Sequence, residues 1–227
     1  MKPWELLART EAPGGGEMTL MRRDREYVIF SRGELLMSSR MVGSETELAA
    51  LACERAAHLD APCVLVGGLG LGYTLRATLD LLPATATVVV AELVPAVVDW
   101  NRGPLAPLAG EPLFDPRVRV ELGDVGALLL ESRSRFDAVL LDVDNGPEPL
   151  VSSSSADLYR HAGLMGVRRA LRPNGVLAVW SAFDDPGFVR RLRQAGFAAR
   201  AARVRARGGR RGPRHTIFVA THDTPPA

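Results

Sequence analysis

The 227-residue sequence is poor in cysteine and lysine and contains no long apolar run. Its two cysteines, Cys53 and Cys63, are too few for a disulfide framework or a four-cysteine zinc site, so we expect reduced thiols and a cytoplasmic protein. The longest apolar stretches, 87–93 and 138–141, are far shorter than the ~18 residues of a membrane span. The residues after Met1 also lack the apolar stretch of a signal peptide. We therefore expect neither a membrane protein nor a secreted precursor.

Positive charge is carried almost entirely by arginine and is uneven along the chain. The net charge is 28 minus 26, or +2, which gives no overall attraction to nucleic acid. Residues 186–222 contain ten arginines and no acid. Lys2 is the only lysine, so arginine is the default cation of this sequence, and no aromatic residue for base stacking lies between Arg200 and Arg214. We interpret the arginines as a solvated surface and expect no nucleic-acid partner.

The first part of the sequence has a β pattern. Residues 18–39 alternate apolar and polar side chains around breaks at 23–25 and 31–33, which predicts a small antiparallel meander. The sequence contains no repeat and no long linker. We therefore expect an N-terminal β-rich region at 1–43 and one α/β domain at 44–227.

Strands and helices alternate after this region. We expect helices at 45–58 (with Ser44 as N-cap), 71–82, 95–101, 157–171 and 184–196, and strands at 62–68, 87–93, 118–124, 136–144 and 175–181. These strands are continuously apolar, which predicts a parallel sheet covered on both faces. Two further strands, at 197–207 and 215–222, follow each other without a helix, so the last one should run antiparallel. The expected fold class is α/β, a Rossmann-like sheet of seven mostly parallel strands.

Glycines follow the first of these strands. Gly67, Gly68, Gly70 and Gly72 lie between the strand and a helix, where glycine lets the backbone turn tightly and approach a nucleotide at the helix N-terminus. Tyr73 occupies the third glycine position of the dinucleotide fingerprint, which argues against NAD. The loop therefore favours a nucleotide that is not a dinucleotide.

Acidic residues stand at the ends of the next two strands. The carboxylate of Glu92 can accept both ribose hydroxyl protons of an adenosine group, and Asp124 can accept the amino hydrogens of adenine. Ligands bind at the carboxyl ends of parallel strands, so both acids and the glycines should lie at one edge of the sheet. Together they predict an adenosine-binding site.

Asp142 and Asp144 lie two residues apart at the end of a strand, so an extended backbone places both carboxylates on one face. Two close like charges raise the pKa of one of them, which suits a general base, or they attract a cationic amine or a divalent ion. With Asn145 they form an alternative magnesium site, but no third acid has suitable spacing, and we favour a site without metal. The four histidines show no ligand spacing and no triad pattern, and we assign no function to His215 or the others.

Five segments, 64–68, 90–98, 123–124, 136–142 and 158–177, resemble the spermidine synthase family, and the resemblance covers about residues 18–200. It implies a class I methyltransferase-like Rossmann fold that binds S-adenosylmethionine or its decarboxylated form. It also implies that Glu92 holds the ribose, that Asp124 holds the adenine amino group, and that Asp142 is the base that deprotonates the attacking amine. The family commonly forms homodimers through its N-terminal region, so we expect a homodimer.

Three positions depart from the family pattern. Gly70 stands where the family's loop usually has an aspartate that pairs with the ammonium group of the decarboxylated donor, which favours intact S-adenosylmethionine. Asn145 replaces the second, amine-holding acid. Residues 45–47 read Glu-Thr-Glu where the family has Tyr-His-Glu, so one acid is kept and the tyrosine and histidine rings are lost. These changes weaken the expectation that the acceptor is a diamine such as putrescine.

We therefore expect a transferase that moves a methyl group from S-adenosylmethionine to a small amine or similar nucleophile. Asp142 and Asp144 are the expected catalytic acids, and Glu47, Asn145 and Tyr159 are expected to line the acceptor site, whereas Trp180 should belong to the core. Two alternatives stay open. One is aminopropyl transfer from decarboxylated S-adenosylmethionine, and the other is a nucleotide-binding protein without activity.

Overall fold

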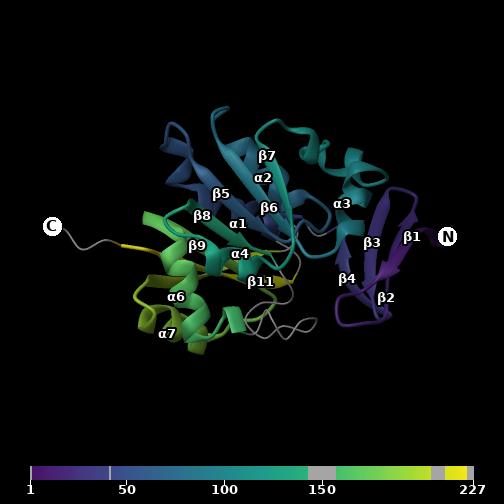
Figure 1. Cartoon of the computed structure of the whole chain (residues 1–227). Helices are drawn as coiled ribbons and strands as arrows, with labels where there is room; N and C mark the ends of the chain where they lie inside the picture. Colours follow the sequence, from purple (N-terminus) through teal and green to yellow (C-terminus); the bar gives the residue numbers. More distant parts are fainter. Residues whose placement is uncertain (1, 41, 143–156, 206–212, 224–227) are drawn as a thin grey trace.

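The computed structural model describes residues 2–40, 42–142, 157–205 and 213–223. The chain begins with a four-stranded antiparallel sheet of β1 (Glu5–Glu11), β2 (Glu17–Arg23), β3 (Glu26–Ser31) and β4 (Glu34–Ser38), in that order. This sheet contains the predicted meander and one more strand, β1, which the sequence pattern did not indicate. Figure 1 shows the sheet beside α3 at one end of the molecule.

The second sheet has seven strands in the order β10-β11-β9-β8-β5-β6-β7. The strands are β5 (Cys63–Gly67), β6 (Thr87–Glu92), β7 (Val118–Leu122), β8 (Phe136–Leu141), β9 (Leu171–Ser181), β10 (Ala198–Arg205) and β11 (Arg214–Thr221). Neighbouring strands from β7 to β9 are parallel, whereas β11 is antiparallel to both β9 and β10. This topology confirms the predicted α/β fold class, including the antiparallel last strand.

Helices cover both faces of this sheet, which explains its continuously apolar strands. They are α1 (Gly43–Cys53), α2 (Tyr73–Leu81), α3 (Pro95–Arg102), α4 (Val125–Glu131), α6 (His161–Ala170) and α7 (Pro186–Gln194), with short 3-10 turns at Ala56–His58, Ala106–Ala109 and Pro112–Phe114. Alternate residues of β5 enter opposite cores. Val64 and Val66 pack with α1, α2 and α3, whereas Leu65 packs with α4, α6 and α7.

Three local predictions differ from the structure. Ser44 is not the N-cap of the first helix, because α1 begins at Gly43, two residues earlier than predicted, with Val42 as its N-cap. The Ser44 hydroxyl donates to the Glu45 side chain instead. Helix α4 was not predicted, although Asp124 caps it. The strand predicted at 175–181 begins four residues earlier, because residues 171–174 also belong to β9, where the pairing with β8 shifts register and Asn174 has a φ of 63°.

The carboxyl ends of the central parallel strands meet at one edge of the second sheet. Gly67, Glu92 and Asp142 lie at or directly after the ends of β5, β6 and β8. The N-terminal sheet packs at the same edge, because Leu20 and Ile29 share one apolar core with α2 and α3. No helix in the described part of the chain has the length and apolar content needed to cross a membrane.

Candidate functional site

The glycine loop between β5 and α2 is tightly enclosed. Gly68, Gly70 and Gly72 have positive φ angles of 87°, 51° and 84°. A Cβ atom on Gly70 would lie 2.7 Å from the sulfur of Met37, and one on Gly72 would lie 2.9 Å from the Oδ1 atom of Asn101. Both the backbone angles and the space therefore require glycine at positions 70 and 72.

Asn101 holds this loop from the end of α3. Its side chain is 1% exposed, and its Nδ2 donates to the carbonyl oxygens of Gly70 at 2.8 Å and Val97 at 2.9 Å. We did not predict a function for Asn101 from the sequence. The signal was weak, because a single amide in the last turn of a helix does not indicate which distant carbonyl it contacts.

Glu92 joins the glycine loop to the loop that follows β6. Its carboxylate is 7% exposed and accepts backbone N–H groups from Leu69 at 2.9 Å and Val94 at 2.8 Å. Burial raises the pKa of Glu92, and these backbone donors act in the opposite direction because they stabilise its ionised form.

Asp124 lies two residues after the end of β7. Its Oδ1 accepts the backbone N–H of Ala127 at 2.9 Å and so caps α4. This hydrogen bond fixes the Asp124 carboxylate at the carboxyl edge of the second sheet.

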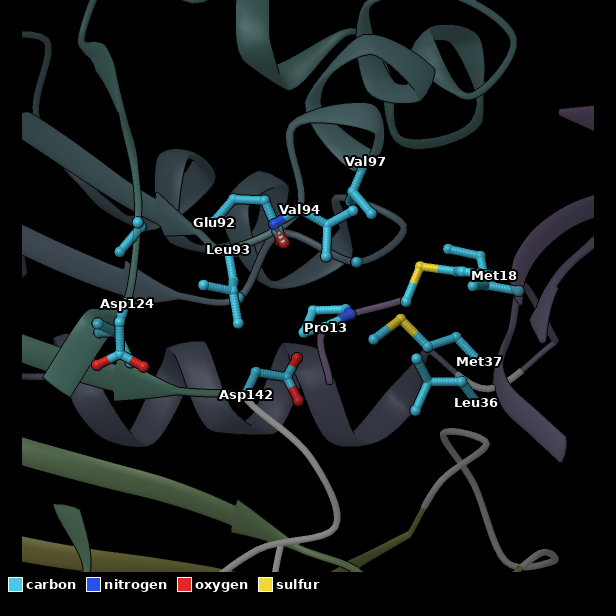
Figure 2. A pocket seen from close by; sticks show the side chains of 16 residues that line it. Pro13, Met18, Leu36, Met37, Glu92, Leu93, Val94, Val97, Asp124 and Asp142 are labelled. Atoms are coloured by element: carbon cyan, nitrogen blue, oxygen red, sulfur yellow. Dashed lines mark hydrogen bonds between the residues drawn. The ribbon is translucent and has the colours of Figure 1, made fainter. Parts of the chain in front are cut away.

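Glu92, Asp124 and Asp142 line one cavity, which we call the first cavity, together with Gly68 and Gly70. The opposite wall comes from the N-terminal part of the chain and consists of Pro13, Met18, Ile29, Leu36 and Met37. Figure 2 shows Asp124 at one end, Met18 and Met37 at the other, and Glu92 and Asp142 on opposite sides between them.

A second cavity adjoins the first. Its own lining includes Ser44, Glu45, Tyr73, Thr74, Trp180 and His215. Leu36, Met37, Gly70 and Asp142 line both cavities. The two spaces therefore meet at Asp142, where one molecule in each could react with the other.

Asp142 is half-buried directly after β8, where its backbone N–H donates to the Gly67 carbonyl at 3.0 Å. The hydroxyl of Thr74 donates to its Oδ2 at 2.6 Å. Burial raises the pKa of Asp142, and the Thr74 hydrogen bond lowers it by a smaller amount. Figure 2 shows the carboxylate pointing into the first cavity.

Glu45 is the second acid of the second cavity. Burial and the negative charge of Asp142 raise the pKa of Glu45 to about 7. Ser44 Oγ donates to its Oε2 at 2.8 Å, and His215 Nδ1 lies 3.2 Å from the same hydroxyl oxygen. The His215 ring packs edge-on against Trp180, with 4.7 Å between the ring centroids.

Several predicted acceptor residues lie elsewhere. Glu47 is exposed on α1 and lines neither cavity. The acid of this segment that lines the second cavity is Glu45. Tyr159 is buried in the core between the sheet and α7, where it contacts the Phe188 ring, and it lines neither cavity. Trp180, which we expected in the core, packs against it and also lines the second cavity.

His215 lines the second cavity as well, although we had assigned it no function. Asp144 and Asn145 lie outside the described residues. Among the residues that are described, no group of three or more histidine, cysteine, aspartate or glutamate side chains could hold a metal ion. The magnesium alternative depends on Asp144 and Asn145 and stays untested.

These observations define a class of fold: a class I methyltransferase-like sheet whose carboxyl edge is covered by an N-terminal antiparallel sheet. Solved spermidine synthases share it. One from Thermotoga maritima has a TM-score of 0.74 and 17% identity, over 96% of this chain and 72% of that one. Another, in complex with the transition-state analogue AdoDATO, has a TM-score of 0.73 and 16% identity over the same shares.

Sequence comparison identifies particular relatives. The chain is 35% identical over 122 residues to a polyamine aminopropyltransferase of Nitrosomonas europaea and 31% identical over 120 residues to one of Thermoanaerobacter sp.. The alignments cover 54% and 53% of this chain but only 36% and 41% of these relatives, so the chain matches less than half of their length. No family model matches. The resemblance to the spermidine synthase-like family and its fold is confirmed.

Proposed function

We propose that the chain is a transferase that moves an aminopropyl group from decarboxylated S-adenosylmethionine to a small amine. The observation that carries the proposal is the meeting of two cavities at Asp142. The names of the sequence relatives support the identity of the transferred group. The methyl transfer that we expected from the sequence finds no support among these relatives.

The first cavity fits an adenosyl sulfonium donor. Asp124 and the apolar Leu93 and Val125 suit adenine at one end. The buried carboxylate of Glu92, which backbone N–H groups hold in place, lies in the lining where it could accept hydrogen bonds from the ribose hydroxyls. Gly70 has no side chain to separate its backbone from the donor.

In the proposed reaction, the amine nitrogen attacks the donor carbon that is bonded to the sulfonium sulfur. The carbon–sulfur bond breaks, its electron pair stays on sulfur, and the donor leaves as a neutral thioether. The nitrogen loses one proton. Because the donor is already activated, the chain contributes alignment, worth up to ~7–11 kcal/mol in ideal systems, and a group that accepts the proton.

Asp142 is the proton acceptor in this proposal. It lines both cavities, and Thr74 fixes one of its oxygens. Burial raises the pKa of Asp142, which makes its carboxylate a stronger base than that of an exposed aspartate. Asp144 could share this task, but it lies outside the described residues.

The glycine loop favours a second candidate, methyl transfer from intact S-adenosylmethionine. Gly70 carries no charge, and the Met37 sulfur fills the space where its side chain would begin. The loop therefore has no carboxylate that would bind the ammonium group of a decarboxylated donor. It also has none that would repel the carboxylate of intact S-adenosylmethionine.

Calorimetric titration of the purified chain with each donor separates the candidates. We expect tighter binding of decarboxylated S-adenosylmethionine. The Asp142→Asn variant should bind this donor about as well but lose about 10²–10⁴-fold in transfer rate, the usual contribution of a general base. Tighter binding of intact S-adenosylmethionine, with a methylated amine as product, would instead support the second candidate.

Three further properties stay predictions: a cytoplasmic location, a homodimer, and a boundary between two regions at residue 43. Both cysteines are free thiols, with Cys53 buried and Cys63 half-buried. Sedimentation of the purified chain would test the homodimer.

A further inference from the structure

We propose that three arginines and a histidine at the amino edge of the second sheet form a binding site for a phosphate group. They belong to the lining of a third cavity, which consists of Arg133, Ser134, Arg168, Arg169, Leu171 and His222. The described lining of the first two cavities includes none of these residues. The inference therefore goes beyond the proposed transfer and does not depend on it.

The third cavity lies at the edge of the sheet that is opposite to the first two cavities. Ser134 comes two residues before β8, Leu171 is the first residue of β9, and His222 directly follows β11. Because β8 and β9 are parallel and β11 is antiparallel to β9, these three positions meet at the amino edge. Figure 1 shows the end of β11 on the side of the molecule away from the N-terminal sheet. A ligand in the third cavity would not compete with the donor or the acceptor.

Backbone hydrogen bonds bring the lining residues together from three distant segments. The N–H of Ser134 donates to the Arg169 carbonyl at 2.8 Å, which places Arg133 beside the last turn of α6. The N–H of His222 donates to the Gly175 carbonyl at 2.8 Å, which ties the end of β11 to β9. The backbone around the cavity is therefore fixed without a ligand, which lowers the cost of binding one.

Positive charge without compensation is the first observation that indicates an anion. The described lining contains Arg133, Arg168 and Arg169 and no acidic residue. None of the three forms an ion pair with another described residue. Like charges that share a cavity repel each other, and an anion between them replaces this repulsion with attraction.

Neighbouring arginines at the same edge show that this lack of acids is local. Arg135 Nη2 lies 2.6 Å from Glu121 Oε1, and Arg172 Nη1 lies 2.6 Å from Asp137 Oδ2. Arginines at the amino edge are thus neutralised where an acid is within reach. The third cavity differs because its described lining contains none.

A buried polar atom is the second observation. Nδ1 of His222 is buried and has no hydrogen-bond partner among the described residues. Such an atom is unfavourable unless it gains a partner. A phosphate oxygen in the cavity that His222 lines would accept a hydrogen bond from the Nδ1–H tautomer.

The end of α6 explains only part of this cluster. Arg168 and Arg169 lie in the last turn of α6, where cations offset the negative end of the helix dipole. Arg133 follows α4 and His222 follows β11, so neither belongs to this helix. A helix-end effect therefore does not account for basic groups from three segments around one cavity.

A phosphate group suits this set of donors. Guanidinium groups bind phosphate oxygens through two parallel N–H groups, and arginine clusters are a common means of phosphate recognition. The lining adds the hydroxyl of Ser134 and the ring of His222, and only Leu171 of the described lining is apolar. A small ligand rich in charged oxygens therefore fits the cavity better than an apolar one.

Arg190 provides a matched control. It lies on α7, is exposed like Arg133 and Arg169, and is absent from the described lining of all three cavities. Arg133→Gln, Arg169→Gln and Arg190→Gln each remove one positive charge at an exposed position. A general effect of net charge would appear in all three variants, whereas an effect of the third cavity would appear only in the first two.

Calorimetric titration with orthophosphate, pyrophosphate and glycerol 3-phosphate at constant ionic strength tests the inference. These probes carry no adenosine, which could enter the first cavity. We expect at least one probe to bind the original chain. Arg133→Gln and Arg169→Gln should each weaken this binding about 10-fold or more, as expected for loss of a charge-assisted hydrogen bond, and Arg190→Gln should leave it unchanged. His222→Ala should also weaken it, and His222→Asn, whose amide keeps an N–H donor, should restore part of the loss.

An absence of binding by the original chain for every probe would overturn the inference. Unchanged affinity in Arg133→Gln and Arg169→Gln, or an equal loss in Arg190→Gln, would overturn it as well. Tightest binding of glycerol 3-phosphate would assign an organic phosphate as the ligand, and tightest binding of pyrophosphate or orthophosphate would assign a free inorganic one. Urea unfolding without phosphate reports whether each variant keeps its fold, and a bound probe should raise the unfolding midpoint of the original chain.

Discussion

At the scale of single residues, the site depends on two carboxylates brought together from distant parts of the sequence. Glu45 comes from α1 and Asp142 follows β8, and each affects the other because both line one cavity. The free chain therefore carries an electrostatic cost that a bound cation would relieve. Sites that bind charged ligands commonly reduce stability in this way.

The pKa of Glu45 gives a testable effect on stability. Its folded-state pKa of about 7 lies above the ordinary value of 4.5, so the folded chain holds an extra proton between these two pH values. The stability contributed by protonated Glu45 is fully present below about pH 4.5 and is lost as the pH rises through about 7. Glu45→Gln removes this loss, so the variant should gain roughly 1–3 kcal/mol relative to the original chain between about pH 5 and pH 8.

Urea unfolding at both pH values measures this difference, and Glu47→Gln serves as the control. Asp142, Tyr73 and His215 also face Glu45 in the cavity, and all three stay in both variants. A stability difference between the Glu45→Gln variant and the original chain that does not change with pH would contradict the assigned pKa.

Some residues of the site could be predicted from the sequence, and others could not. Glu92 and Asp124 lie close to strand ends, and the parallel topology brings such positions to one edge. The choice between Glu45 and Glu47 depends instead on which face of α1 packs inward, and the segment gives no clear amphipathic pattern. His215 reaches the cavity from β11, 171 residues from its partner Ser44, so no local pattern could indicate it.

At the scale of elements, the loop from β5 to α2 is fixed by contacts from two sides. Met37 of β4 packs against Gly70. The Asn101 side chain of α3 leaves no room for a Cβ atom on Gly72. The loop conformation therefore depends on the N-terminal sheet and on α3 as well as on its own glycines.

Gly70→Ala should weaken thioether binding in the first cavity. Alanine at a φ of 51° is strained, and its Cβ would lie 2.7 Å from the Met37 sulfur. We expect a cost of roughly 1–3 kcal/mol, seen in calorimetry as about a 5- to 150-fold weaker affinity for methylthioadenosine. Met37→Ala in the same chain should recover part of the loss. If the double variant binds no better than Gly70→Ala, the contact with Met37 is not the cause.

Element boundaries show where sequence patterns were sufficient. The central strands were predicted to within a few residues because each is a short apolar run closed by glycine or acid. Helix α4 was missed because the segment 125–131 is short, and its clearest start signal, the Asp124 cap, had been interpreted only as a ligand-binding acid.

At the scale of the whole molecule, the N-terminal sheet and the second sheet form one core. Leu20 and Ile29 are at most 1% exposed and belong to the same apolar cluster as Val97 of α3. Ile29 and Val97 also line the first cavity. The N-terminal sheet therefore both stabilises the chain and closes the site.

Leu20→Ala tests this shared core. Leu20 is fully buried, so we expect a loss of about 2–5 kcal/mol in the free energy of unfolding. Because one core serves both sheets, unfolding followed by tryptophan fluorescence and by circular dichroism should stay a single transition at a lower urea concentration. Separate transitions for the two sheets would show that their cores are independent.

The most direct test of the account is product analysis by mass spectrometry. The purified chain is incubated with decarboxylated S-adenosylmethionine and a panel of small amines. We expect an aminopropylated amine and methylthioadenosine in equal amounts, with almost none of either from the Asp142→Asn variant. Formation of both products at the same rate by this variant, or a methylated amine from intact S-adenosylmethionine with no aminopropylated product, would contradict it.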